Sequence, residues 1–142
     1  MPIKEQELLD FITHYTGLDL SMEDDIHIKG LVGDDFFDLM EVYSQKYKVD
    51  MSNFLWYFHN MEEGHNIGSL FFKTPNQRVK RIPVTAKMLL GFINTNKWDI
   101  DYPLHFMPKK RWDIIFNRVF FCILAAFFAI LLFMKLNISN TG

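Results

Sequence analysis

The chain is poor in cysteine, because its 142 residues include a single one, Cys122. One thiol excludes a framework of intramolecular disulfides and a cysteine-based zinc finger, so a hydrophobic core must hold the fold together. The composition suits such a core, since 49% of the residues are hydrophobic and 16% are aromatic. Burial of this much apolar surface can offset the loss of conformational entropy, and the length predicts one small domain.

Familiar catalytic motifs are also missing. The sequence has no P-loop, no Gly-x-Gly-x-x-Gly, no Gly-x-Ser-x-Gly and no His-Glu-x-x-His. One short segment, from His59 to His65, gathers two imidazoles with the carboxylates of Glu62 and Glu63, which could bind zinc or perform acid–base chemistry. The two histidines are six residues apart and would fall on opposite sides of a helix. We therefore predict solvated residues here, with no metal and no cofactor, and keep a small metal-dependent hydrolase as the alternative.

The N-terminus has no apolar segment typical of a signal peptide, so we expect no cleavable signal there. The C-terminal part is different, because Val119 to Met134 is a run of sixteen apolar residues. Extended back to Ile114, the run has about 21 residues, enough for a helix to cross a hydrocarbon layer of about 30 Å. A small domain cannot bury a helix that is apolar on every side. We predict one transmembrane helix over residues 113–135, followed by a short tail over 136–142.

Basic residues are concentrated before this run, which predicts its orientation. Positive charge is retained on the cytoplasmic side, so the segment before the span should be cytosolic and the tail should not be. Residues 99–112, with two prolines, are expected to form a semi-rigid basic linker between a cytosolic domain over 1–98 and the membrane. The residues expected at the membrane interface are Lys109, Lys110, Arg111, Trp112 and Arg118, against a single Lys135 after the span.

The remaining sequence predicts a mainly α-helical domain. An apolar stripe from Ile3 to Tyr15 indicates a first helix that ends at Gly17, and a second helix should start at Asp34 or Asp35, whose carboxylates suit an N-cap. Thr85 is expected to cap a third helix over residues 86–94. Two short apolar runs, 70–72 and 79–82, could pair as a small β-hairpin, and the sequence leaves open whether residues 54–83 form that hairpin or short helices.

Charge is strongly segregated along the chain. Residues 1–63 contain 14 acids and 4 bases, whereas residues 64–112 contain 9 bases and 2 acids. The favoured interpretation is a self-complementary fold with a basic cuff next to the membrane. A weaker one is a patch for anionic lipid or nucleic acid, and we predict no nucleic-acid binding. That patch would comprise Lys73, Arg78, Lys80, Arg81 and Lys87.

Four short motifs between residues 5 and 98 occur in a recognisable order. They are Gly33-Asp34-Asp35-Phe36-Phe37-Asp38-Leu39-Met40, then Tyr47-Lys48-Val49-Asp50, then Tyr57-Phe58 with Glu62 or Glu63, and finally Arg81-Ile82-Pro83-Val84-Thr85 through Met88-Leu89 to Trp98. In this order they resemble the bacterial family catalogued as domain of unknown function 1493. The resemblance implies a bacterial protein, with the apolar helix in the inner membrane.

The first half is in turn similar to acyl carrier proteins, in which a serine at the start of an acidic second helix carries a phosphopantetheine arm. Matching Tyr47-Lys48-Val49 to the end of that helix places Gly33 at the serine, and glycine has no hydroxyl. The resemblance therefore implies a carrier-like shape without the prosthetic group. The helix would then offer an acidic surface to a basic protein partner, although an ordinary solvated face is an equal alternative. Its residues would be Asp34, Asp35, Asp38 and Glu41.

Overall fold

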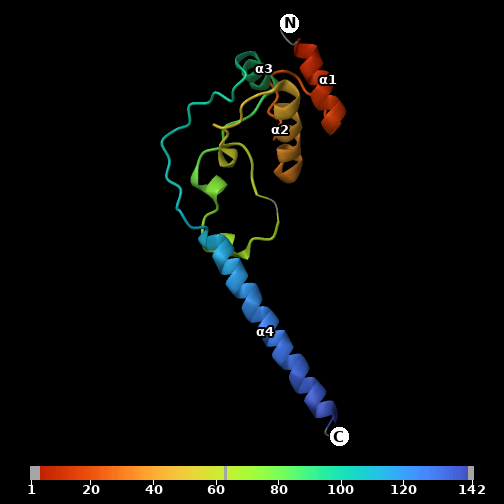
Figure 1. Ribbon diagram of the computed structural model, residues 1–142, viewed down its shortest axis with the longest axis vertical. Coiled ribbons are helices and arrows are strands. Elements are labelled where there is room, and N and C mark those ends of the chain that lie inside the picture. Colours follow the sequence, from red (N-terminus) through yellow and green to blue (C-terminus); the bar gives the residue numbers. More distant parts are fainter. Residues whose placement is uncertain (1–3, 63, 141–142) are drawn as a thin grey trace. The chain divides into compact units, whose positions relative to one another are not determined.

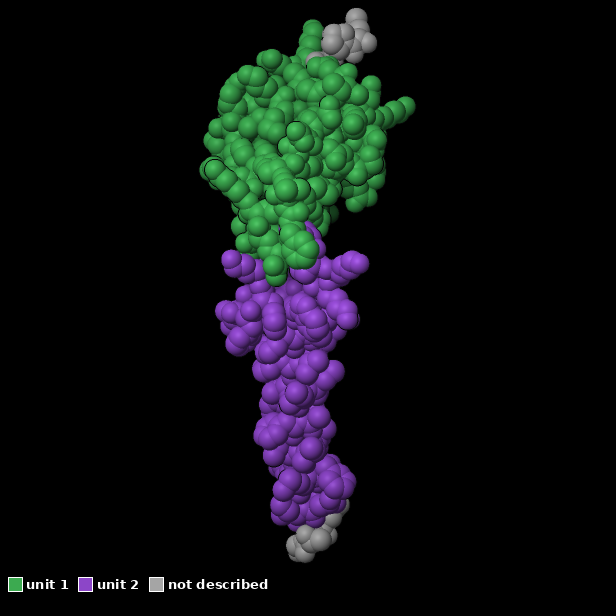
Figure 2. All heavy atoms as spheres, turned by 90° about the vertical axis from the view of Figure 1, so that its left-hand side faces the viewer, with its two compact units in different colours: residues 1–63, 75–106 green, residues 64–74, 107–142 purple. Residues whose placement is uncertain are grey.

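The computed structural model describes residues 4–62 and 64–140. The chain divides into two compact units, the first comprising Met1–Glu63 with Pro75–Phe106 and the second comprising Gly64–Thr74 with Met107–Gly142 (Figures 1 and 2). The fold is mainly α-helical, as the sequence predicts, and no β-strand occurs in the described ranges. Each unit is considered by itself.

Helix α1 (Glu5–Thr16) begins the first unit and buries Leu8 and Ile12. It ends where the sequence predicts, because Gly17 adopts a left-handed conformation (φ 72°) and donates its N–H to the carbonyl of Thr13 at 2.8 Å. Ile3, the first member of the predicted apolar stripe, lies outside the described residues.

Helix α2 (Gly33–Tyr47) does not start as predicted. Its first residue is Gly33, Val32 occupies the N-cap, and no side chain of the N-cap bonds to the helix. Asp34 and Asp35 lie inside the first turn, where carboxylates favour the helix dipole without capping the helix. The prediction that Asp34 or Asp35 caps the helix is therefore wrong. The physical reason is the amide of Asn60, whose Oδ1 accepts the Gly33 N–H at 2.9 Å.

Of the two structures left open for residues 54–83, the described part of the chain has no hairpin but short helical turns. These are η1 (Trp56–Phe58), η2 (Ile67–Leu70) and η3 (Pro75–Arg78). The second run of the expected hairpin bonds elsewhere, since the Ile82 N–H donates to the carbonyl of Phe58 at 2.7 Å. The first run is continuous with η2, where the Asn66 side chain accepts the Ser69 N–H at 3.1 Å.

Helix α3 (Ala86–Thr95) confirms the predicted cap, since the Thr85 hydroxyl oxygen accepts the Met88 N–H at 3.2 Å. Leu89, Phe92 and Ile93 of this helix are buried. The three helices share one core, and the Tyr43 hydroxyl of α2 donates to the carbonyl of Leu89 at 2.7 Å. Burial raises the pKa of Tyr43, so this hydroxyl remains a donor.

Ion pairs link the acidic first half of the sequence to its basic second half within the first unit. The Arg81 guanidinium bonds both carboxylate oxygens of Asp25, and Lys87 lies 3.3 Å from Glu23. A bidentate pair of this kind is geometrically specific. The self-complementary interpretation of the charge segregation thus has a structural counterpart in this unit.

The second unit contains helix α4 (Trp112–Asn140), the long apolar helix that the sequence predicts. It extends beyond the expected 113–135 into the segment 136–140, and residues 141–142 of the expected tail lie outside the described residues. Against its first turns packs η2, so residues 64–74 belong to this unit and not to the helical domain expected over 1–98.

Candidate functional site

Helix α4 is the most distinctive surface of the second unit. Its segment Trp112–Ile138 has 27 residues, and none of its most apolar window is buried. At about 1.5 Å per residue the segment is about 40 Å long, more than a hydrocarbon layer of about 30 Å requires. Length and composition are thus those of a helix that can span a membrane.

The five residues expected at the membrane interface differ in their exposure and in their partners. Lys109, Lys110 and Arg118 are exposed, and the Lys110 ammonium lies 5.7 Å from the centre of the Trp112 ring. Arg111 is different, because its Nε donates to Asp113 Oδ1 at 2.9 Å. One of the basic residues before the helix is therefore paired with an acidic residue of the helix itself.

A polar cluster at the start of α4 is the feature that the sequence analysis missed. Asp113 is 1% exposed and accepts from the Asn66 side chain at 2.9 Å. Asn117, one turn later, accepts the Gly68 N–H through Oδ1 at 2.7 Å and donates from Nδ2 to Asn66 Oδ1 at 2.8 Å. Two polar residues four positions apart near the start of an apolar helix are the sequence signal that could have indicated this cluster.

The four acidic residues expected to bind a partner lie on one helix of the first unit. Asp34, Asp38 and Glu41 occupy neighbouring turns of α2 on the side opposite its buried residues, and Asp35 lies beside them. All four are exposed, and none of them forms an ion pair within the described ranges. Glu41 accepts from the Gln45 side chain at 3.0 Å, and the four carboxylates are open to a ligand, whereas Asp25 and Glu23 are paired with Arg81 and Lys87.

The described part of the first unit has a hollow beside the acidic face of α2 and another beside α1. The one beside the acidic face has a volume of about 290 Å³ and is lined by Tyr15, Thr16, Leu31, Asp35 and Asp38. Two of the predicted docking carboxylates therefore border a concave surface.

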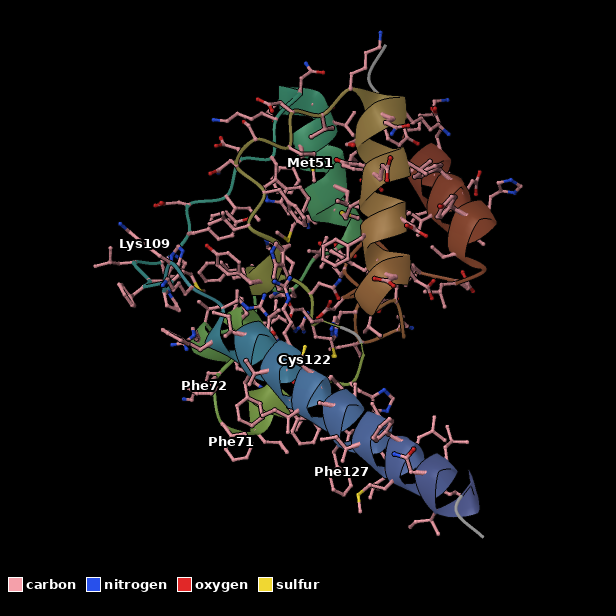
Figure 3. The ribbon with its side chains drawn as sticks, turned by 60° about the horizontal axis from the view of Figure 1, so that its bottom comes forward. Met51, Phe71, Phe72, Lys109, Cys122 and Phe127 are labelled. Carbon is pink, nitrogen blue, oxygen red and sulfur yellow. The ribbon has the colours of Figure 1, made fainter. Side chains whose placement is uncertain are left out.

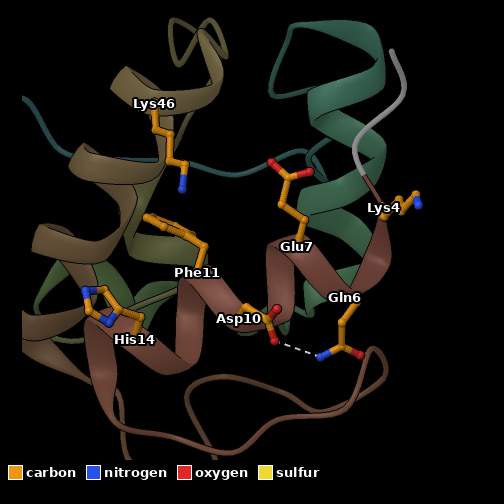
Figure 4. Close-up of a pocket in the computed structure, with 7 residues that line it drawn as sticks. All are labelled: Lys4, Gln6, Glu7, Asp10, Phe11, His14 and Lys46. Atoms are coloured by element: carbon orange, nitrogen blue, oxygen red, sulfur yellow. Dashed lines mark hydrogen bonds between the residues drawn. The ribbon is translucent and has the colours of Figure 1, made fainter.

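The other hollow, of about 430 Å³, lies between α1 and Lys46 of α2 (Figure 4). Its charged groups have both signs and are exposed, and the Lys46 ammonium lies over the Phe11 ring at 4.4 Å from its centre. Gln6 donates to Asp10 at 2.8 Å along its edge. Such a balanced, open lining indicates no particular ligand.

His59, the centre of the alternative metal site, is fully buried. Its Nδ1 lies 3.0 Å from the carbonyl of Ile82, and its Nε2 lies 2.8 Å from the Tyr102 hydroxyl. A carbonyl only accepts, so Nδ1 carries the proton and donates to it. The Tyr102 oxygen accepts from Trp98 Nε1 at 2.8 Å and from the Leu55 N–H at 3.2 Å, which leaves its own proton for His59 Nε2.

Burial lowers the pKa of His59 to about 4, so the ring is neutral at pH 7. Both ring nitrogens are occupied by protein partners, and the side chain has no lone pair left for a metal ion. His65 is exposed, whereas Glu63 lies outside the described residues. In the described part of the chain, no three His, Cys, Asp or Glu residues are grouped closely enough to hold a metal ion.

Comparison of the chain with protein-family models found no match, and comparison with curated proteins and with solved structures found none either. The likeness to the bacterial family and to carrier proteins therefore stays a prediction from the sequence motifs.

Proposed function

We propose that this chain is a non-catalytic interaction module, anchored in the bacterial inner membrane by α4 and docking a basic protein partner on the acidic face of α2. The observation that supports it most directly is the set of four exposed carboxylates without ion pairs, in a chain that also carries one long apolar helix. Elsewhere in the first unit, Asp25 is paired with Arg81 and Glu23 with Lys87, so part of the acidic charge is neutralised within the fold, whereas the charge on α2 is not.

The proposed orientation places the first unit in the cytoplasm and the last residues of the chain on the far side of the membrane. Lys109, Lys110 and Arg118 support it, because exposed basic residues next to a span are retained on the cytoplasmic side. Reporter fusions test this directly. Alkaline phosphatase should be active at the C-terminus and inactive at the N-terminus, and the reverse pattern would overturn the orientation.

We further propose a carrier-like domain that has no prosthetic group. Gly33 supports this in two ways, since it has no hydroxyl and both of its backbone polar groups are held by Asn60, at 2.9 Å for the N–H and 2.8 Å for the carbonyl. Incubation with coenzyme A and a promiscuous phosphopantetheinyl transferase should leave the intact mass unchanged. A mass increase equal to one phosphopantetheine arm would contradict the proposal.

The docking face is tested with two variants of the full chain, in each of which four carboxylates are replaced by neutral amides. One carries Asp34→Asn, Asp35→Asn, Asp38→Asn and Glu41→Gln, and its matched control carries Glu5→Gln, Glu7→Gln, Asp10→Asn and Asp19→Asn, which are four exposed acids elsewhere in the same unit. A partner cross-linked by the wild type in cell membranes should be lost from the first variant and kept by the second. Equal capture by both variants would exclude α2 as the docking surface.

A further inference from the structure

The second unit exposes an apolar tip beside its long helix. Leu70, Phe71 and Phe72 have exposed fractions of 80%, 66% and 37%, although they follow one another directly in the chain. Three consecutive large apolar residues on the surface of a soluble protein are costly, and contiguous apolar patches mark interaction sites. Figure 3 shows Phe71 and Phe72 beside the first turns of α4.

Aromatic contacts join this tip to α4. The Phe71 ring centre lies 4.9 Å from that of Phe116, and the Phe72 ring lies 6.2 Å from it. Phe116 stacks in turn on Phe120, at 6.3 Å with nearly parallel planes. A continuous row of rings thus runs from the tip to the apolar run of the helix.

The polar cluster fixes the tip to this level of the helix. Asn66 and the Gly68 N–H, at the base of the tip, are hydrogen-bonded to Asp113 and Asn117 of α4. The backbones approach each other closely at Gly68, where an added Cβ would lie 2.1 Å from the backbone oxygen of Asp113. A glycine is required at this approach, and the tip has little freedom to move along the helix.

The position along α4 identifies what covers the tip. Phe116 precedes the uninterrupted apolar run at Val119 by three residues, a rise of about 5 Å, which is within the interfacial layer of a bilayer. Exposed Lys109, Lys110 and Lys73 belong to the same unit and suit anionic headgroups. Apolar side chains of amphipathic segments insert to about 5–10 Å at this boundary.

We infer that Leu70, Phe71 and Phe72 form a membrane wedge, inserted into the leaflet in which α4 begins, so that the chain holds the bilayer at two points. The occupant is the lipid interface and not a second protein. The wedge rests on the proposed membrane span of α4, and it adds a function for residues 64–74. Attachment at two points fixes the rotation of α4 about its own axis, which a single helix leaves free.

Fluorescent labels on the full chain in phosphatidylcholine–phosphatidylglycerol vesicles test the wedge. In a Cys122→Ala background, a nitrobenzoxadiazole label is attached through Leu70→Cys, through Ile28→Cys or through Ala126→Cys. Ile28 is the matched control, because it is an apolar residue of the first unit with an exposed fraction of 75%. Ala126 reports on the middle of α4.

Iodide in the aqueous phase should quench the label at residue 70 several-fold less than the label at residue 28. Nitroxide lipids labelled near the headgroup should quench residue 70 more than those labelled near the chain end, with the reverse order at residue 126. If residue 70 is quenched by iodide like residue 28 while residue 126 is protected, the wedge is wrong and the span stands. If residue 126 is also open to iodide, α4 does not cross the bilayer, and both proposals fall.

A second variant tests the attachment of the wedge. Asn117→Ala removes both the acceptor of the Gly68 N–H and a donor to Asn66. With the label at residue 70, this change should increase iodide quenching, because the tip is no longer held against α4. Unchanged quenching would show that the polar cluster does not position the tip and would overturn this part of the inference.

Discussion

At the scale of single residues, His59 couples the stability of the first unit to pH. Its folded pKa of about 4 lies below the ordinary value of 6.5, because burial disfavours the charged ring. The unfolded chain therefore binds this proton at a higher pH than the folded chain does. The contribution of His59 to stability is complete above pH 6.5 and is lost as the pH falls toward 4.

We expect the free energy of unfolding to fall by about 2–3 kcal/mol between pH 7 and pH 4.5, since each pKa unit corresponds to about 1.4 kcal/mol. Urea titration of the full chain in detergent micelles, followed by tryptophan fluorescence, measures this. His59→Gln should lower stability at pH 7 and flatten the pH dependence, whereas His14→Gln, at an exposed position, should leave the dependence in place.

His27 contributes in the same direction, because burial and the nearby Arg81 lower its pKa, against the opposing effect of Asp25. Most of the residual slope in His59→Gln is therefore assigned to His27 and should be lost in the double variant, except near pH 4.5, where carboxylates with a lowered pKa such as Asp25 begin to contribute. A slope in His59→Gln as steep as that of the wild type would contradict the role of His59.

Gly68 is a second residue whose identity the structure requires. Gly68→Ala would place a Cβ 2.1 Å from the Asp113 carbonyl oxygen, which is backbone and cannot give way easily. We expect residues 64–74 to separate from α4, with amide hydrogen exchange in this segment faster by at least tenfold. The control is Gly91→Ala in α3, where a Cβ meets nothing within 4 Å and helix propensity improves by up to about 1 kcal/mol. Equal exchange in both variants would show that the close approach is not needed.

At the scale of elements, the start of α2 depends on a residue far away in the sequence. Asn60 is 3% exposed and bonds both the N–H and the carbonyl of Gly33, whose φ of 58° is left-handed. Glycine adopts this conformation at little cost, and the amide of Asn60 replaces the missing N-cap side chain. The start of α2 thus depends on a glycine and on a side-chain amide that lies 27 residues further along the chain.

We expect Asn60→Ala to destabilise the first unit by about 2–4 kcal/mol, since two buried backbone groups lose their partners. Hydrogen exchange should accelerate most in the first turn of α2. Asn94→Ala, at an exposed position in α3, serves as the matched control and should change stability by less than about 0.5 kcal/mol. Comparable losses in the two variants would contradict the bracing role of Asn60.

These elements also show what the sequence can predict and what it cannot. Local signals worked where the partner is a few residues away, as for the Gly17 C-cap and for Thr85, which bonds Met88. They failed where the partner is distant, as for the pairing of Gly33 with Asn60 or of Ile82 with Phe58. Periodicity and composition contain no information on such long-range bonds.

The candidate sites divide in the same way. The apolar run of α4 and the exposed carboxylates of α2 follow from composition and helical period alone. Only half of the polar cluster could be foreseen: the i, i+4 pair of Asp113 and Asn117 is visible in the sequence, but their partner Asn66 lies about fifty positions away. His59 looked solvated in the sequence, and only its burial beside Tyr102 reveals a structural role.

At the scale of the whole molecule, the boundary of the first unit decides which piece can fold by itself. The sequence places it at residue 98, with a linker from 99 to 112, whereas the first compact unit continues to Phe106. Tyr102 explains the difference. Its hydroxyl is bonded to His59, to Trp98 and to the Leu55 N–H, and its ring lies 4.8 Å from that of Phe58.

Two truncated chains distinguish the boundaries. Both carry Leu70→Ser, Phe71→Ser and Phe72→Ser to remove the apolar tip, and they end after Phe106 or after Asp101. We expect the longer chain to unfold cooperatively and the shorter one to be less stable by about 3–5 kcal/mol, as for removal of a large aromatic side chain from a core. Thermal and urea unfolding, monitored by circular dichroism, measure the difference.

Tyr102→Phe in the longer chain separates the hydroxyl from the ring. It removes the three hydrogen bonds of the phenol and keeps the packing against Phe58, so its cost should be intermediate, about 1–3 kcal/mol. It should also strand the Trp98 N–H, which shifts tryptophan emission relative to the unsubstituted chain. If the chain ending at Asp101 is as stable as the one ending at Phe106, residues 102–106 are linker, and the boundary predicted from the sequence is the correct one.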